Sequence, residues 1–155
     1  MLDMHAELLE MYRVTPQTLR ALVRGIDAGQ ARERPDVEGW SIVEVVAHLA
    51  DIEGHAHERI RRMLAEDKPL IEGIDEQALA REHRYHEWDL SDALHRFEEE
   101  RAEHVATLEA LGPDAWERLG RHSEFGDITV ESLTRLMAFH DAIHLAQVGR
   151  IVLGE

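Results

Sequence analysis

The strongest constraint on this chain is a pair of histidines placed four residues apart in a long apolar stretch near its C-terminus. From Thr129 to about Leu153, apolar side chains recur every three or four residues, which predicts an amphipathic helix. His140 and His144 fall on the apolar stripe of that helix, where core leucines would normally lie. Residues four apart stand one above the other, so both imidazoles point in one direction. Burying two imidazoles side by side is costly unless they share a partner.

Three further helices are predicted by the same periodicity. The first contains Pro16, which removes one backbone donor and is expected to bend the helix. The second begins at a capping box, in which Ser41 is followed three residues later by Glu44. The third is ended by Gly112 and Pro113. The expected ranges are about residues 3–27, 41–64 and 90–111, with a loop over residues 28–40.

The connection between the second and third predicted helices is long, from Glu66 to Trp88, with a short helix expected near residues 75–84. A connection of this length can travel the height of a bundle, roughly 30 Å, so the two helices that it joins can run parallel. No convincing strand pattern is present. The sequence therefore predicts an all-α four-helix bundle with a long crossover between helices 2 and 3, formed as a single domain over residues 1–155.

Composition narrows the classes of partner. The chain has 32 acidic and 17 basic residues, a formal net charge of -15, and no cysteine. A surface this acidic repels phosphate backbones, so nucleic acid is not an expected partner. A run of about 18 apolar residues is absent, so no membrane span is expected. The N-terminus lacks the features of a signal peptide, so a cytoplasmic location is expected. Thiolate ligands, disulfides and a cysteine nucleophile are excluded.

A third imidazole is expected to complete a metal site with the histidine pair. His48 is the best candidate, because it lies at the edge of the apolar stripe of the second predicted helix. Three neutral imidazoles around a divalent ion leave a position open for water or substrate, as in catalytic sites. Imidazole suits zinc, nickel, iron or copper, and manganese is a further candidate. The competing interpretation is that each histidine is a packed, hydrogen-bonded core side chain.

Polar residues near the three histidines are candidates for supporting roles. Asp51 follows the second-helix histidine by three residues, and Asp141 and Gln147 flank the C-terminal pair; each could accept an outer imidazole N–H and fix its tautomer. The alternative is that both acids are solvated. Arg101 lies on the apolar stripe of the third helix and either faces an anionic substrate or forms a structural ion pair, which is the favoured role. His55 and His57 are expected too far along helix 2 to join the site. The remaining histidines are expected to be solvated: His83, His86, His95, His104 and His122.

At this point the sequence resembles the DinB-like superfamily, in particular its YfiT-like branch. The resemblance covers nearly the whole chain and rests on three segments: GWSIVEVVAHLADIE at 39–53, RHSEFGDIT at 121–129 and HDAIHLAQ at 140–147. It implies a four-helix bundle with the long middle crossover. It also implies a divalent metal at a cleft, held by His48, His140 and His144, and often a homodimer.

Three alternative functions are then compatible with the residues and the resemblance. Relatives include thiol S-transferases that use bacillithiol, mycothiol or glutathione, so the first is a transferase that joins a low-molecular-weight thiol to a small electrophilic substrate, with zinc, nickel, iron or manganese as cofactor. The second is a hydrolase in which metal-activated water attacks and Asp141 or a nearby acid acts as base. The third is a non-catalytic metal-binding or stress-response dimer. Thiol-dependent turnover separates the first from the second.

Overall fold

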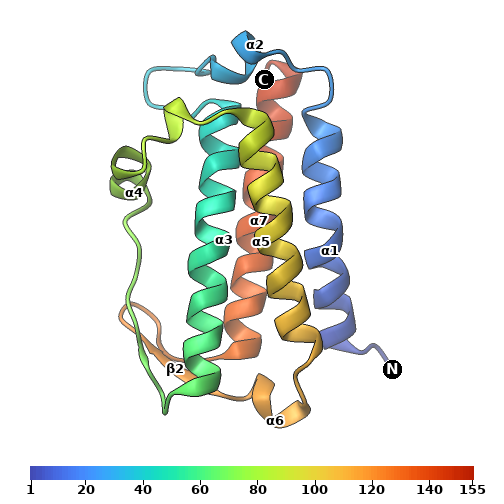
Figure 1. Cartoon of the computed structure of the whole chain (residues 1–155), viewed down its shortest axis with the longest axis vertical. Helices are drawn as coiled ribbons and strands as arrows, with labels where there is room; N and C mark the ends of the chain where they lie inside the picture. The colour runs from blue at the N-terminus through green and yellow to red at the C-terminus, as the bar shows by residue number, and fades with distance from the viewer.

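Four long helices stand side by side in the computed structural model, which describes residues 1–155 (Figure 1). This confirms the predicted four-helix bundle. No helix combines the length and the apolar character that crossing a membrane would need. The long helices are α1 (Met4–Leu22), α3 (Ile42–Ala65), α5 (Leu90–Glu109) and α7 (Val130–Leu153). The shorter elements are α2 (Ala28–Arg32), β1 (Leu70–Ile71), α4 (Glu76–Glu82), the 3-10 helix η1 (Tyr85–Glu87), α6 (Pro113–Trp116), β2 (Leu119–His122) and β3 (Gly126–Thr129).

The connection between α3 and α5 is the predicted crossover. After α3 ends, the chain returns along the side of the bundle, so that α3 and α5 both run from the top to the bottom of Figure 1. The short helix α4 lies in this returning segment, close to the range expected from the sequence. The crossover therefore places a short helix beside α3, where it can contribute side chains to a site on that helix.

Capping side chains fix the first residues of the two helices that carry the histidines. The Ser41 hydroxyl accepts from the Glu44 backbone N–H at 3.2 Å, and the Glu44 carboxylate accepts from the Ser41 N–H at 3.3 Å. Thr129 begins α7 with the same kind of capping box. The first helix is shorter than predicted: it ends at Leu22, and Gly25 adopts a φ of 80° that an L side chain rarely takes. The short helix α2 occupies part of the expected loop.

A small sheet at one end of the bundle was not predicted, and the expectation of no strands is wrong. β1 pairs parallel with β2, and β2 pairs antiparallel with β3. Strands of two to four residues are too short to show a periodic pattern. Gly120 lets β2 approach the end of α3, since a Cβ there would lie 3.0 Å from Ile71 Cγ1 and 3.1 Å from Met63 Cγ.

The core consists of two apolar clusters with polar residues between them. One cluster contains residues such as Leu19, Val45, Phe97 and Val148, and the other contains Leu8, Ile60, Leu108 and Leu133. On every long helix the change from one cluster to the other occurs next to a proline or a polar side chain. We call these residues the polar layer: Pro16 on α1; His48, Asp51 and Glu53 on α3; Arg101 and His104 on α5; His140, Asp141 and His144 on α7.

Candidate metal centre

The three predicted metal ligands come together at one point of the polar layer. α3 contributes His48, α7 contributes His140 and His144, and α4 adds Glu76. One ligand atom from each of these four residues lies within 4.8 Å of the others. The Nε2 atoms of His48 and His140 are 3.0 Å apart. Glu76 Oε1 lies 3.3 Å from His140 Nε2 and 3.6 Å from His48 Nε2. Three helices therefore bring three imidazoles and one carboxylate to the same place.

The surroundings favour the neutral forms of His48 and His144 and the charged form of the Glu76 carboxylate. Burial, followed by the nearby His144, lowers the pKa of His48 to about 3. Burial also lowers the pKa of His144. Contact with the His140 imidazole lowers the pKa of the Glu76 carboxyl. At neutral pH His48 and His144 therefore present neutral nitrogens and Glu76 presents an ionised carboxylate, which are the forms that bind metal.

The arrangement fits a divalent metal ion. His144 Nδ1 shares a hydrogen bond of 2.8 Å with Gln147 Oε1, so its Nε2 is left for the site, as predicted for Gln147. The Nδ1 atoms of His48 and His140 are buried without a hydrogen-bond partner. Zinc binds imidazole nitrogen at about 2.0–2.1 Å, so two nitrogens 3.0 Å apart can both reach one ion. Imidazole and carboxylate donors suit zinc, nickel, iron or manganese.

Two aromatic side chains form a wall beside the imidazoles. The Trp40 ring lies 4.9 Å from the His48 ring and stacks at 6.4 Å on His144. The Tyr85 ring lies 6.1 Å from the His48 ring, and its hydroxyl donates to Asp51 Oδ2 at 2.7 Å. Asp51 thus supports the tyrosine, and the expectation that it accepts the outer N–H of His48 is wrong. These rings restrict how the imidazoles can rotate.

Asp141 does not accept from an imidazole either. Its Oδ2 accepts from Arg101 Nη2 at 2.8 Å, so the predicted imidazole partner for this acid is wrong. Arg101 instead forms the structural ion pair that the sequence favoured, with Asp141 and with Glu53. Burial raises the pKa of the Asp141 carboxyl, although the arginine opposes the rise. Burial would also raise the pKa of Glu53, but the arginine and His104 lower it to about 2.

Two histidines that were expected to be solvated, His104 and His122, are buried, and so is His57, which was expected too far along helix 2 to join the site. His104 is fully buried, His57 is 1% exposed and His122 is 5% exposed. His104 lies three residues after Arg101, on the same face of α5, and its Nδ1 shares a hydrogen bond of 2.7 Å with Glu53. The spacing of three residues between Arg101 and His104 was visible in the sequence. Position 104 is itself not one of the apolar positions of the predicted helix, so the spacing did not indicate burial. None of these three joins the candidate metal group.

Glu76 is the site residue that the sequence analysis missed. It lies on a helix of seven residues inside the crossover, where the periodic pattern is weak. The chain has 32 acidic residues, so a single glutamate at this position carries no signal of its own. Only the path of the crossover past α3 and α7 brings this carboxylate to the imidazoles.

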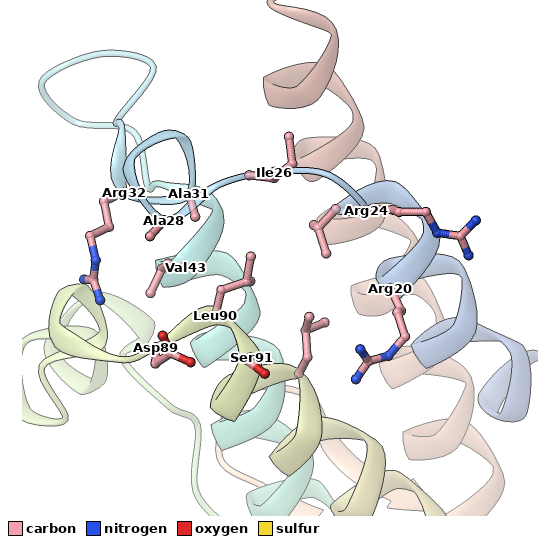
Figure 2. A pocket seen from close by; sticks show the side chains of 12 residues that line it. Arg20, Arg24, Ile26, Ala28, Ala31, Arg32, Val43, Asp89, Leu90 and Ser91 are labelled. Carbon is pink, nitrogen blue, oxygen red and sulfur yellow. The ribbon is translucent and has the colours of Figure 1, made fainter.

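Two hollows in the surface differ in their relation to this site. One of about 700 Å³ is lined by Trp40 together with Arg34, Gln77 and Arg81. It therefore shares its tryptophan with the aromatic wall of the metal group. The other, of about 460 Å³, lies where α1, α2 and the start of α5 meet (Figure 2). None of His48, Glu76, His140 and His144 lines either hollow. In the second hollow, Arg20 Nε donates to Glu98, and Arg32 donates to two backbone carbonyls.

Comparison with known proteins places the chain in a family. The profile of the DinB superfamily matches residues 11–148, which is most of the chain. The chain belongs to the DinB superfamily. This confirms the resemblance read from the three sequence segments. The candidate metal centre lies within the matched residues.

Several curated relatives share the metal-related name. A protein of Oceanobacillus iheyensis named "Putative metal-dependent hydrolase" is 30% identical over 115 residues, which are 71% of this chain and 63% of that protein. A protein of Geobacillus thermodenitrificans with the same name is 28% identical over 143 residues, 92% of this chain and 80% of that protein. "Putative metal-dependent hydrolase YfiT" of Bacillus subtilis is 29% identical over 111 residues, 71% of this chain and 62% of that protein.

Solved structures support the fold of this DinB superfamily member. Bacillus subtilis YfiT, described as a probable metal-dependent hydrolase with an unusual four-helix bundle topology, superposes with a TM-score of 0.87 at 24% identity. That match covers 95% of this chain and 85% of YfiT. The four-helix bundle protein TT2238 superposes with a TM-score of 0.68 at 21% identity, covering 93% and 97%. Both matches show the same fold.

Removal of any one of the three histidines should abolish metal binding. We expect about one divalent ion per chain in the wild type, and loss of that ion in His48→Ala, His140→Ala and His144→Ala, because two remaining imidazoles hold an ion far more weakly. Elemental analysis after incubation with zinc, nickel, iron or manganese measures this. His95→Ala, at an exposed position of α5, is the control and should keep its metal. A wild type that stays metal-free would show that the histidines are packing residues.

The metal-free protein should lose stability as the pH falls below about 6.5. Burial, with the neighbouring His104, lowers the pKa of His57 from 6.5 to about 4. The unfolded chain then binds a proton that the folded chain does not, so stability falls between pH 6.5 and pH 4. His57→Gln should make this decline less steep, and His95→Gln, at an exposed position, should not. Chemical unfolding of chelator-treated protein across this pH range measures both slopes, and equal slopes in wild type and His57→Gln would contradict the assignment.

Proposed function

We propose that this chain is a divalent-metal-dependent enzyme that activates a low-molecular-weight thiol for attack on a small electrophile. The observation that carries the proposal is the grouping of three imidazoles, those of His48, His140 and His144, with the carboxylate of Glu76. An ion held there would lower the pKa of a bound thiol or water, so that a nucleophile would be available at neutral pH. The names of the curated relatives support the metal dependence. The use of a thiol is inferred from the resemblance to the thiol S-transferases of the superfamily.

Glu76 is the residue best placed to take a proton from the nucleophile. Its side chain is 45% exposed, whereas the His48 side chain is fully buried, so the carboxylate lies between the imidazoles and solvent. Its lowered pKa keeps it ionised, as a proton acceptor must be. Asp141, the base considered from the sequence, is only 3% exposed and its Oδ2 is bonded to Arg101. We therefore assign the proton-accepting role to Glu76.

The hollow beside Trp40 supports a small-molecule substrate. Its volume of about 700 Å³ falls within the range of small-molecule sites. Gln77 and Arg81 of α4 line it and lie on the same short helix as Glu76. A substrate in this hollow would contact one face of the tryptophan wall and the helix that carries the proton acceptor. We place the electrophile or the body of the thiol there.

Hydrolysis is the second candidate function. The same four side chains could activate water instead of a thiol, and the half-exposed Glu76 carboxylate could accept its proton. The relatives named as metal-dependent hydrolases favour this candidate. The two reactions need the same protein groups and differ in whether a thiol is consumed. A non-catalytic metal-binding protein is the third.

Turnover should require a thiol, the metal and Glu76. We expect the metal-loaded wild type to consume bacillithiol, mycothiol or glutathione in the presence of an electrophilic substrate, followed by the loss of free thiol. Glu76→Gln should keep its metal, because the three imidazoles remain, and lose turnover by about 10²- to 10⁴-fold, the usual effect of a general base. His48→Ala should lose both metal and turnover. Glu82→Gln, which changes an exposed acid on the same helix, is the matched control.

Other outcomes would select a different function. Turnover of ester or amide substrates without any thiol would replace the transferase with the hydrolase. Full activity of Glu76→Gln would remove the proposed role of that carboxylate. Metal binding without turnover in both substrate panels would favour the non-catalytic protein.

We also propose that two copies of the chain associate through the outer face of α7. Leu136, Phe139 and Ile143 lie on this face and are 40%, 69% and 63% exposed. Between Leu136 and Gly149 the only ionisable side chains are His140, Asp141 and His144, which are buried or directed to the site. Two chains that each carry a net charge of -15 can approach most easily over a face without carboxylates. This supports the homodimer implied by the resemblance.

A charge on this face should separate the two copies. We expect the wild type to sediment at twice the chain mass of 17.8 kDa and Phe139→Glu to sediment as a monomer, because a buried carboxylate at the contact is costly. Val37→Glu, at a 91% exposed loop position, should remain dimeric. Analytical ultracentrifugation distinguishes these states. A monomeric wild type would end the proposal for this surface.

A further inference from the structure

The guanidinium of Arg101 contacts all three of the other long helices. Its Nε and Nη2 donate to the two carboxylate oxygens of Glu53 on α3 at 2.8 and 2.9 Å. Its Nη2 also donates to Asp141 on α7 at 2.8 Å, and its Nη1 donates to the backbone carbonyl of Tyr12 on α1 at 3.0 Å. The arginine is only 1% exposed. One side chain of α5 therefore holds the whole bundle together at this level.

The contact with α1 depends on a proline. In an α-helix the carbonyl of residue 12 normally accepts from the N–H of residue 16. Pro16 lies inside α1 and has no N–H, so it cannot donate the usual helical hydrogen bond to the Tyr12 carbonyl. Arg101 supplies the missing donor. The proline thus leaves a backbone carbonyl of α1 available as a hydrogen-bond acceptor for the arginine.

The other two contacts lie on the helices that carry the candidate metal ligands. Asp141 is the neighbour of His140 and precedes His144 by three residues on α7. Glu53 follows His48 by five residues on α3, about 7.5 Å further along the axis. The arginine therefore ties α3 and α7 together about one and a half turns from His48 on α3, and less than one turn from the histidine pair on α7. Without its positive charge, the buried Asp141 carboxylate would lose its ion-pair partner, and Glu53 would keep only its hydrogen bond with His104.

We propose that Arg101 is a positioning residue of the metal centre: by joining Glu53 to Asp141 it fixes the separation and register of α3 and α7, and so the distance between His48 and the histidine pair. This inference rests on the proposed metal centre. The arginine does not touch the candidate ligands, and it acts through the two helices. A planar guanidinium can bond two carboxylates and a carbonyl at once, whereas a lysine ammonium is a single point of charge on a flexible stem.

Arg101→Lys is the test, because it keeps the positive charge and removes the planar guanidinium that bonds several acceptors at once. We expect the variant to fold and to bind zinc about 10- to 100-fold more weakly than the wild type, the range known for outer residues that orient metal ligands. Competition with a chromophoric chelator measures the affinity. The absorption spectrum of the cobalt(II)-loaded protein reports the ligand geometry, and it should shift in Arg101→Lys. Neither measurement depends on enzyme activity.

Arg118→Lys is the matched control. Arg118 also donates to backbone carbonyls of α3 or just beyond it, those of Met63 and Glu66, but it contacts no carboxylate of α7. Its lysine variant should lose stability and keep the zinc affinity and cobalt spectrum of the wild type. If Arg101→Lys does not fold, Glu53→Gln, which weakens one arm of the same link, should lower the zinc affinity in the same direction.

Three results would overturn the proposal. Equal zinc affinity and an unchanged cobalt spectrum in Arg101→Lys would make the arginine a purely structural residue. Equal losses of affinity in Arg101→Lys and Arg118→Lys would show that general loosening of the bundle explains the effect. If the wild type takes up neither zinc nor cobalt, the metal centre and the positioning role fall together.

Discussion

The structure depends on a buried cation that no single helix can satisfy. The Arg101 guanidinium needs acceptors on several sides, and α1, α3 and α7 each supply one. Leaving any of those acceptors or the arginine unpaired in the core would cost several kcal/mol, of the order of 3–5 kcal/mol for one broken buried pair. Apolar packing alone would permit small changes in helix register. The fixed directions of these hydrogen bonds do not, so they select one register for all four helices.

The polar layer provides the location of the candidate metal centre. The two apolar clusters on either side exclude water from the middle of the four helices. Within that dry layer, burial lowers the pKa of His48 to about 3, which keeps its nitrogen free of protons. The short helix α4 then closes the layer on its outer side with the half-exposed Glu76. The long helices thus supply the imidazoles, and the short helix of the crossover supplies the carboxylate that reaches solvent.

Long periodic helices were predictable from the sequence, whereas contacts made by short or irregular segments were not. The histidine pair and His48 could be found because they interrupt strong apolar stripes on α3 and α7. Arg101 could be found for the same reason. Glu76 could not, because a seven-residue helix has no stripe to interrupt and its position depends on the path of the crossover. The partners of Asp51 and Asp141 were predicted wrongly because spacing along one helix says nothing about side chains that arrive from another.

The charges of the polar layer favour a divalent cation at this position. When ionised, Asp51, Glu53 and Asp141 of the polar layer and the adjacent Glu76 carry four negative charges, and Arg101 carries one positive charge. His48 and His144 add none in their neutral forms, which burial favours. The acids therefore exceed the buried arginine in charge. Coulomb attraction is strong in a layer from which water is excluded, so an ion at the imidazoles would lessen the repulsion among the buried acids. A divalent ion can therefore reduce the charge imbalance that the single arginine leaves.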